Sequence, residues 1–424
     1  MNRLDIFDRA RSGITPPPEH KGKGNKNLDY ILDKLAGSLI RDGSSSLIKV
    51  EHSIPKMSVH GSVVLNDADV FNIHLLPVLL QQHSGILSRN FSAGDLLFFD
   101  IETTGLSGGA GTNVFLIGLL HITDNDIQII QYFLNNLSSE RFFLELLNNH
   151  FSRGAVLVSY NGKGFDYNVI KSRCILNSLP FGELNPLHLD LLFTSRRIWK
   201  GMFPDFSLKT VERMALGFDR YRDIPGFRIP EVYFDYLKGR DAAEDLYAVF
   251  LHNKNDVLSL LALLIKQLAL VKSGLEIRNR EKNRYDELFN PASLSDMLIK
   301  SNYNDEAKSL LYCHIEDTEA LKRLGLLCKK QKHTDDALRF FKLITERTEG
   351  LLDYIFACTE IAKLYEHVLR DIECALSYTE KARERLKRSS HFYHEYNSLF
   401  EKEGVLIEKR LHRLQKKLSS VKHC

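Results

Sequence analysis

A short apolar run that ends in two spaced carboxylates most constrains how this chain folds. The four consecutive apolar residues at 96–99 are followed by Asp100, Ile101 and Glu102. An unbroken apolar run of this length is typical of a strand that is buried on both faces. Because side chains two residues apart on a strand point to the same face, Asp100 and Glu102 are predicted to project side by side, with Ile101 in the core.

This pair of acids allows two interpretations. Carboxylates crowded at the end of a buried strand repel each other and lose hydration, and a divalent cation between them offsets both effects. The alternative is a pair of solvated acids at a strand end, which an Asp-x-Glu pattern alone leaves open. The apolar run before Asp100 and the glycine-rich turn predicted over 105–111 favour the metal site.

The residues around this strand predict an α/β domain. Four further strands are predicted over 114–122, 127–133, 155–160 and 187–191, the first two joined by a hairpin at 123–126. Helices are predicted over 138–150, from 165 onward, over 207–216 and over 242–271. Three antiparallel strands followed by alternating helix and strand predict a mixed five-stranded sheet with flanking helices.

Two more candidate site groups lie on predicted helices. Asp166 falls in a first helical turn, where an acid also simply complements the helix dipole. The glycines just before it, at 162 and 164, lack the Gly-Lys-Ser/Thr of a phosphate-binding loop. His252 and Asp256 are four residues apart and therefore share one helix face. Taken alone, such a pair is often an ordinary surface pair.

Several motifs together resemble a known family. Asp-Ile-Glu-Thr-Thr-Gly-Leu at 100–106, Asn-Gly-x-x-Phe-Asp at 161–166 and x-Asn-x-x-Asp-Val at 252–257 are similar to the three motifs of the DEDD 3′–5′ exonucleases. The stretches 99–118, 189–199, 207–213 and 229–237 resemble the bacterial YprB-like, ribonuclease-H-like proteins. The resemblance covers about residues 93–271, and that family tends to carry C-terminal tetratricopeptide-like helices.

The resemblance implies a two-metal-ion active site. Asp100, Glu102, Asp166 and Asp256 fall on the four carboxylates that bind two Mg²⁺ or Mn²⁺ ions, and His252 falls on the general base. Histidine-type members usually place this residue five positions before the last aspartate and tyrosine-type members four, so this chain has a histidine at the tyrosine spacing. The implied activity is 3′–5′ exonucleolytic cleavage of single-stranded DNA or RNA. The alternative is a weak or inactive nucleic-acid-binding scaffold whose helical repeats dock a protein partner.

Basic and aromatic residues alternate after the last predicted strand. Residues 196–240 contain ten Lys or Arg against six Asp or Glu, with Tyr221, Phe227, Tyr233 and Phe234 among them. Such a mixture suits the backbone and bases of a single nucleic-acid strand, and a solvated helical surface is the alternative. Asp190 is interpreted as a structural acid that pairs with the nearby arginines at 196 and 197, and a rim that faces phosphate is the alternative.

Beyond about residue 285 the pattern predicts only short amphipathic helices. Gly325 and Ala337, twelve residues apart, match the positions where two antiparallel helices of a tetratricopeptide repeat approach closely, and a generic helical bundle is the alternative. The predicted organisation is an N-terminal extension at 1–92 without an assigned role, an exonuclease domain at 93–275 and helical repeats at 285–424. Within the extension, a helix is predicted near 28–40 and short strands are predicted near 48–51 and 62–65.

Bulk properties predict a soluble cytoplasmic protein. The net charge is +3, the six cysteines form no Cys-x-x-Cys pair, and the first residues lack the apolar segment of a signal peptide. The longest apolar run, 257–271, is interrupted by Ser259, Lys266 and Gln267 and is predicted to be a buried helix, with no membrane contact.

Overall fold

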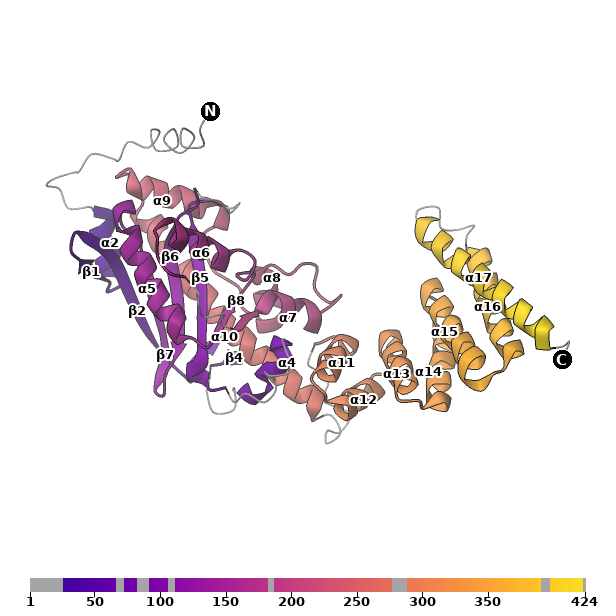
Figure 1. Ribbon diagram of the computed structural model, residues 1–424. Coiled ribbons are helices and arrows are strands. Elements are labelled where there is room, and N and C mark those ends of the chain that lie inside the picture. Colours follow the sequence, from indigo (N-terminus) through magenta and orange to yellow (C-terminus); the bar gives the residue numbers. More distant parts are fainter. Residues whose placement is uncertain are drawn as a thin grey trace, which may run out of the picture. The chain divides into compact units, whose positions relative to one another are not determined.

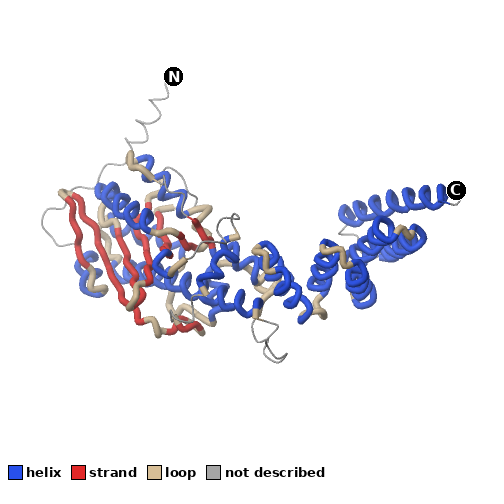
Figure 2. The backbone as a smooth tube through the Cα atoms, turned by 60° about the horizontal axis from the view of Figure 1, so that its bottom comes forward, coloured by secondary structure: helices blue, strands red, loops and turns tan. Residues whose placement is uncertain are grey.

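The chain folds into two compact units. The computed structural model describes residues 26–65, 72–81, 91–105, 111–181, 187–276, 288–389 and 397–421. The first unit comprises Met1–Arg196 and Phe203–Ala269, and the second comprises Arg197–Met202 and Leu270–Cys424. All strands of the described chain belong to the first unit, as Figure 2 shows in red, and the second unit is helical.

The first unit contains a seven-stranded mixed sheet (Figure 1). Its strands, in spatial order, are β1 (Ser38–Asp42), β2 (Ser45–Pro55), β7 (Asp126–Phe133), β6 (Val114–Ile122), β5 (Leu96–Thr103), β8 (Val156–Ser159) and β9 (Leu187–Asp190). Neighbouring strands are antiparallel from β1 to β5, and β5, β8 and β9 are parallel. The mixed sheet with flanking helices is thus confirmed. Most of the glycine turn predicted after β5 lies outside the described residues.

The predicted count of five strands is wrong, because the N-terminal segment adds β1 and β2. The helix expected near residues 28–40 ends early, as α2 (Lys26–Lys34), and the chain then enters β1. Leu39 and Ile40 pair with Ile48 and Leu47 of β2, which in turn pairs with β7 along its length. Pairing with an existing sheet edge overrides the weak local helix signal. The strand expected at 62–65 forms only the two-residue β4 (Val63–Val64), paired with β3 (Val59–His60).

Helices cover both faces of the sheet at β5. The ring of Phe99 lies 5.2 Å from that of Phe151 on α5 (Glu140–Arg153). Asp100, the next residue, points to the opposite face and contacts Asn253 on α10 (Ala243–Leu275). Since alternate side chains of a strand point to opposite faces, α5 and α10 lie on different sides of the sheet. The remaining helices of this unit are α4 (Leu76–Leu80), α6 (Asp166–Leu176), α7 (Leu191–Ile198), α8 (Leu208–Val211) and α9 (Ile229–Leu237).

Helix α10 is longer than the apolar run in the sequence. Among the described residues it is the one helix whose length and composition would suffice to cross a membrane, with a mean hydropathy of 1.7 in its most apolar window. Of that window, 72% is buried inside the structure. This burial matches the buried helix that the sequence predicts.

The second unit is a succession of helices, each packed on the next. They are α11 (Pro291–Lys300), α12 (Asn304–Cys313), α13 (Thr318–Lys330), α14 (Thr334–Arg347), α15 (Leu351–Leu364), α16 (Ile372–Ser389) and α17 (Asn397–Val421). Gly325 of α13 faces Phe341 of α14, and Ala337 is fully buried in the same core cluster. A helical C-terminal region is confirmed, and its tetratricopeptide-like nature stays a prediction.

Replacing Gly325 with leucine is expected to destabilise the second unit. A Cβ atom at this position would lie 2.4 Å from the buried ring of Phe341, and overpacking of this kind costs about 1–3 kcal/mol. Leucine is a better helix former than glycine, so any loss comes from packing rather than propensity. Leu326→Ala, at an exposed position on the same helix, is the control and is expected to stay within about 0.5 kcal/mol. An unchanged urea midpoint for Gly325→Leu would contradict the close packing of α13 and α14.

Candidate metal-ion active site

Four carboxylates from three elements lie close together at the centre of the first unit. Asp100 and Glu102 project from β5, Asp166 is the first residue of α6, and Asp256 lies on α10. Asp166 and Asp256 each act electrostatically on both Asp100 and Glu102. The structure thus brings together four acids that are far apart in the sequence.

Three of these acids have a raised pKa. Burial raises the pKa of Asp100 well above its usual range, and the charges of Asp256, Glu102 and Asp166 raise it further. Burial raises the pKa of Glu102 to about 8, against the lowering effect of His252. Burial, with the charges of neighbouring aspartates, raises the pKa of Asp166 to about 7. Acids in this state lack a compensating cation.

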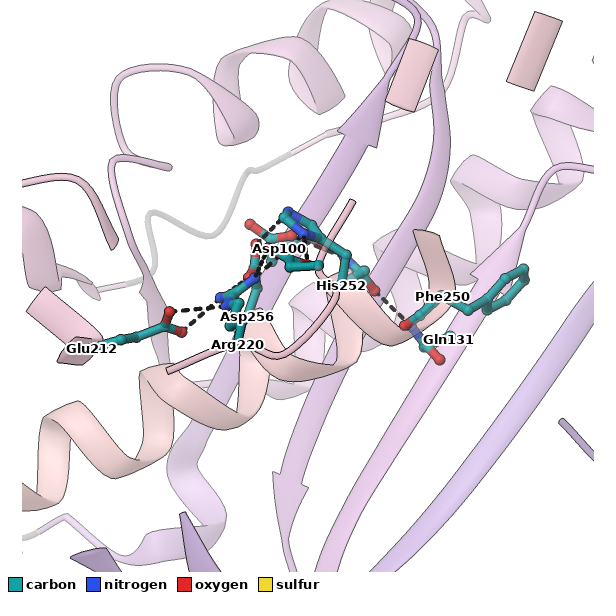
Figure 3. A network of polar contacts seen from close by, with 9 residues as sticks. Asp100, Gln131, Glu212, Arg220, Phe250, His252 and Asp256 are labelled. Carbon is teal, nitrogen blue, oxygen red and sulfur yellow. Dashed lines mark hydrogen bonds and ion pairs between the residues drawn. The ribbon is translucent and has the colours of Figure 1, made fainter. Parts of the chain in front are cut away.

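Asn253 holds Asp100 in place. Its Nδ2 donates to the Asp100 carboxylate at 2.9 Å and to the Asp100 carbonyl at 3.2 Å. Gln131 Nε2 donates in turn to Asn253 Oδ1 at 2.9 Å and to the carbonyl of Phe250 at 2.9 Å (Figure 3). Gly118, the partner of Asp100 across β5 and β6, leaves room for Asn253, since a Cβ there would lie 2.4 Å from Oδ1.

Asp190 fixes the turn that leads to Asp166. Its carboxylate accepts hydrogen bonds from the backbone N–H groups of Asn161 at 2.8 Å and Lys163 at 3.1 Å, and from Leu192 at 3.1 Å. The expected pairing of Asp190 with arginines is therefore wrong: its carboxylate is satisfied by backbone amides. Such bonds order a loop that has no regular ladder of its own.

The same turn requires a glycine beside the site. A Cβ atom on Gly162 would lie 2.6 Å from the hydroxyl of Ser159 and 2.8 Å from the carboxylate of Asp166. The turn also places Asn161 in the left-handed region, at φ 62°. The Asn-Gly pair of the motif thus supplies the two residue types that this bend tolerates best.

A buried arginine joins the acids of the site. Arg220 donates from Nε and Nη2 to both carboxylate oxygens of Glu212, at 2.9 and 2.6 Å, and its Nη2 also bonds Asp256 (Figure 3). The Arg220 side chain is 4% exposed and that of Glu212 is 0% exposed. Glu212 begins a π-helical segment, Glu212–Leu216, that directly follows α8. In the sequence Arg220 is only one of the ten Lys or Arg residues at 196–240.

His252 lies between two aspartates. Its Nδ1 bonds Asp223 Oδ1 at 2.7 Å, and its Nε2 lies 3.6 Å from Asp256 Oδ2. Burial lowers the pKa of His252, but the bond to Asp223 and the charges of Asp256 and Glu102 outweigh it and raise the pKa to about 9. In the protein without bound cations this value lies well above 6.5, the ordinary pKa of histidine. Asp223 belongs to none of the motifs recognised in the sequence.

The donor set fits divalent cations. Ligand atoms of Glu102, His252 and Asp256 all lie within 4.8 Å of one another. Carboxylate oxygens are the ligands that Mg²⁺ and Mn²⁺ prefer, and no cysteine is part of the cluster. Burial first, and the charges of neighbouring carboxylates second, raise the pKa values of Asp100, Glu102 and Asp166, and bound divalent cations would offset both effects.

The aromatic residues of 196–240 differ in their surroundings. Tyr233 is fully buried and stacks on Phe115 at 4.1 Å, so it belongs to the core. Tyr221, Phe227 and Phe234 are exposed. The interpretation of this segment as a surface for bases therefore fails for Tyr233 and stays open for the other three.

The metal-free protein is expected to lose stability as the pH rises from about 5 to about 9. Glu102, Asp166 and His252 all have a higher pKa in the folded chain than their usual values. Each such group stabilises the fold while it is protonated and ceases to do so as the pH passes its folded pKa. Thermal unfolding in a chelator at several pH values measures the effect, and Mn²⁺ should raise the melting temperature more at pH 8 than at pH 6. Glu102→Gln should flatten the profile, and a melting temperature that rises over this interval would contradict the prediction.

Comparison with known proteins agrees with the fold. Residues 97–268 match the model of the RNase_H superfamily. A family B DNA polymerase from the hyperthermophilic archaeon Pyrobaculum calidifontis aligns with a TM-score of 0.34 and 16% identity, over 55% of this chain and 29% of the polymerase. This chain spans under a third of the length of the polymerase.

A bacterial relative is similar over most of both chains. The uncharacterized protein YprB of Bacillus subtilis (strain 168) is 31% identical over 344 residues, which are 78% of this chain and 77% of the relative. The chain therefore belongs to the YprB family and carries a ribonuclease-H-superfamily domain.

Proposed function

We propose that this protein is a metal-dependent 3′–5′ exonuclease that acts on single-stranded DNA or RNA. The observation that carries the proposal is the convergence of Asp100, Glu102, Asp166 and Asp256 in one buried cluster. A purely structural role explains such a cluster poorly, because buried acids without a compensating charge destabilise a fold. The membership of the ribonuclease H superfamily supports a nuclease.

The protein's own residues prepare the site. Two divalent cations bound by the carboxylates would polarise the attacking water, stabilise the leaving oxygen and offset the charge that raises the pKa of His252. Asn253 fixes the orientation of Asp100 through the bond to its carboxylate. Asp223 holds Nδ1 of His252, so that Nε2 faces Glu102 and Asp256. In this arrangement Nε2 is the atom that accepts the proton of the nucleophilic water.

His252 is expected to control the pH dependence of the rate. As general base it should give a rate that rises with pH along an acidic limb, which His252→Ala removes. Asp223→Asn should move the limb to lower pH, because the bond to Asp223 raises the pKa of His252. The measurement is the pH–rate profile of the three proteins at saturating Mn²⁺. If His252→Ala has the same pH–rate profile as the wild type, His252 is not the general base and the cations alone activate the water.

Digestion of end-labelled oligonucleotides tests the function. Single- and double-stranded DNA and RNA carrying a 5′ label are incubated with Mg²⁺, Mn²⁺ or a chelator. We expect a ladder that shortens from the 3′ end, abolished by the chelator and strongest on single strands. Cleavage of a circular single strand, which has no ends, would show that the protein is an endonuclease and not an exonuclease. Cation-dependent cleavage of none of these substrates would favour a nucleic-acid-binding scaffold.

A further inference from the structure

One exposed turn is fastened at both of its ends to the candidate active site. Arg220 bonds Asp256, and Asp223 bonds His252. Only Tyr221 and Arg222 lie between these two anchors, and they form the turn itself. Consecutive Cα atoms are about 3.8 Å apart, so both residues stand at the rim of the cluster of acids.

The two residues point outward and stack on each other. Tyr221 is 85% exposed, whereas the side chain of Arg220 before it is 4% exposed. The guanidinium carbon of Arg222 lies 5.1 Å from the centroid of the Tyr221 ring. Arg222 adopts a φ of 53°, in the left-handed region that a long side chain rarely adopts. A backbone conformation of this kind has a cost, and such costs cluster at functional positions.

The electrostatics of this rim suit a polyanion. Burial raises the pKa of Asp223, but the bond to His252 and the charges of His252, Arg220 and Lys209 outweigh burial and lower it. Lys209 therefore lies near this end of the turn. Lys209 and Arg222 are both exposed. Exposed cations beside a flat aromatic ring are the combination that contacts the phosphates and bases of a single strand.

We propose that Tyr221 and Arg222 form a stacking platform for an unpaired base beside the scissile phosphate, which makes the site selective for single-stranded over paired ends. This inference rests on the proposed function and assigns its strand preference to two residues. At a paired end the last base is hydrogen-bonded to its partner and stacked on its neighbour, so it reaches the platform only after it has been unpaired and unstacked. A single-stranded end presents its base without that cost.

Binding measured without cleavage tests the platform. Fluorescence anisotropy of the full-length protein in a chelator is compared for a single-stranded oligonucleotide and for the same oligonucleotide with abasic nucleotides at its 3′ end. Tyr221→Ala is expected to weaken binding of the intact strand about tenfold, the size of one base–aromatic stack, and Tyr221→Trp to retain it. On the abasic strand, wild type and Tyr221→Ala should bind equally.

Two further variants separate stacking from charge. Phe227→Ala removes an aromatic ring that is 73% exposed on the same segment but lies outside the anchored turn, and it should change binding less than about twofold. Arg222→Asn places at this position a residue that tolerates positive φ. The slope of log affinity against log salt should become shallower by the amount that corresponds to about one phosphate contact.

The outcomes distinguish the platform from the nuclease. Three results would overturn the platform. Wild type and Tyr221→Ala could bind the intact strand equally, or Tyr221→Ala could lose as much affinity for the abasic strand as for the intact one. The third such result is that the wild type binds neither strand. If the platform effects appear but no cation-dependent cleavage is found, the proposed nuclease fails while the platform stands as a binding surface. Because Tyr221 is exposed, its variants are expected to unfold at the wild-type temperature.

Discussion

Asp100→Asn is expected to lower nuclease activity about a hundredfold or more, the loss typical of removing one positioned group that stabilises transition-state charge. Asparagine keeps an oxygen that can accept the hydrogen bond from Asn253, so the contact between β5 and α10 survives. The fold should even gain stability near pH 8 without cations, because the substitution removes one charge from the crowded cluster. Initial rates at saturating Mn²⁺ and thermal unfolding in a chelator measure the two effects.

An acid outside the cluster provides the matched control. Asp124 is exposed in the hairpin between β6 and β7, and Asp124→Asn should leave both the rate and the melting temperature unchanged. A wild-type rate in Asp100→Asn would remove Asp100 from the catalytic machinery. Loss of activity in both variants would indicate a general effect of surface charge on substrate binding instead.

Arg220→Leu is expected to lower the free energy of unfolding by about 3–5 kcal/mol, the usual cost of removing one partner of a buried ion pair. The change leaves the carboxylate of Glu212, which is 0% exposed, without its two bonds from Arg220. It also removes the bond from Arg220 to Asp256, which keeps His252 Nε2 at 3.6 Å as a nearby cation. Urea unfolding in a chelator measures the loss.

A double variant identifies the cause. Arg220→Leu combined with Glu212→Leu removes both charges, so part of the lost stability should return. Arg222→Asn, two residues along the same turn and exposed, is the control for the segment. A single variant within about 1 kcal/mol of the wild type would mean that water reaches Glu212 in solution.

Elements with strong local patterns were predicted well. The apolar run before Asp100 forms β5, and the alternation of the strand places Asp100 and Glu102 on one face. The helix that carries His252 and Asp256 is present, and their spacing places both at the site. The count of strands was wrong because β1 and β2 depend on a sheet edge that is supplied by residues far along the chain.

The sequence by itself determined which acids stand on which strand or helix, because periodicity within one element fixes the direction of its side chains. Only the tertiary structure decided what surrounds them. Arg220 reaches Asp256 across 36 residues, and Asn253 reaches Asp100 across 153 residues, in a space that Gly118 leaves open. Contacts of this kind follow from the packing of separate elements, so a local sequence pattern cannot predict them. The pKa of His252 likewise depends on charges that folding brings together.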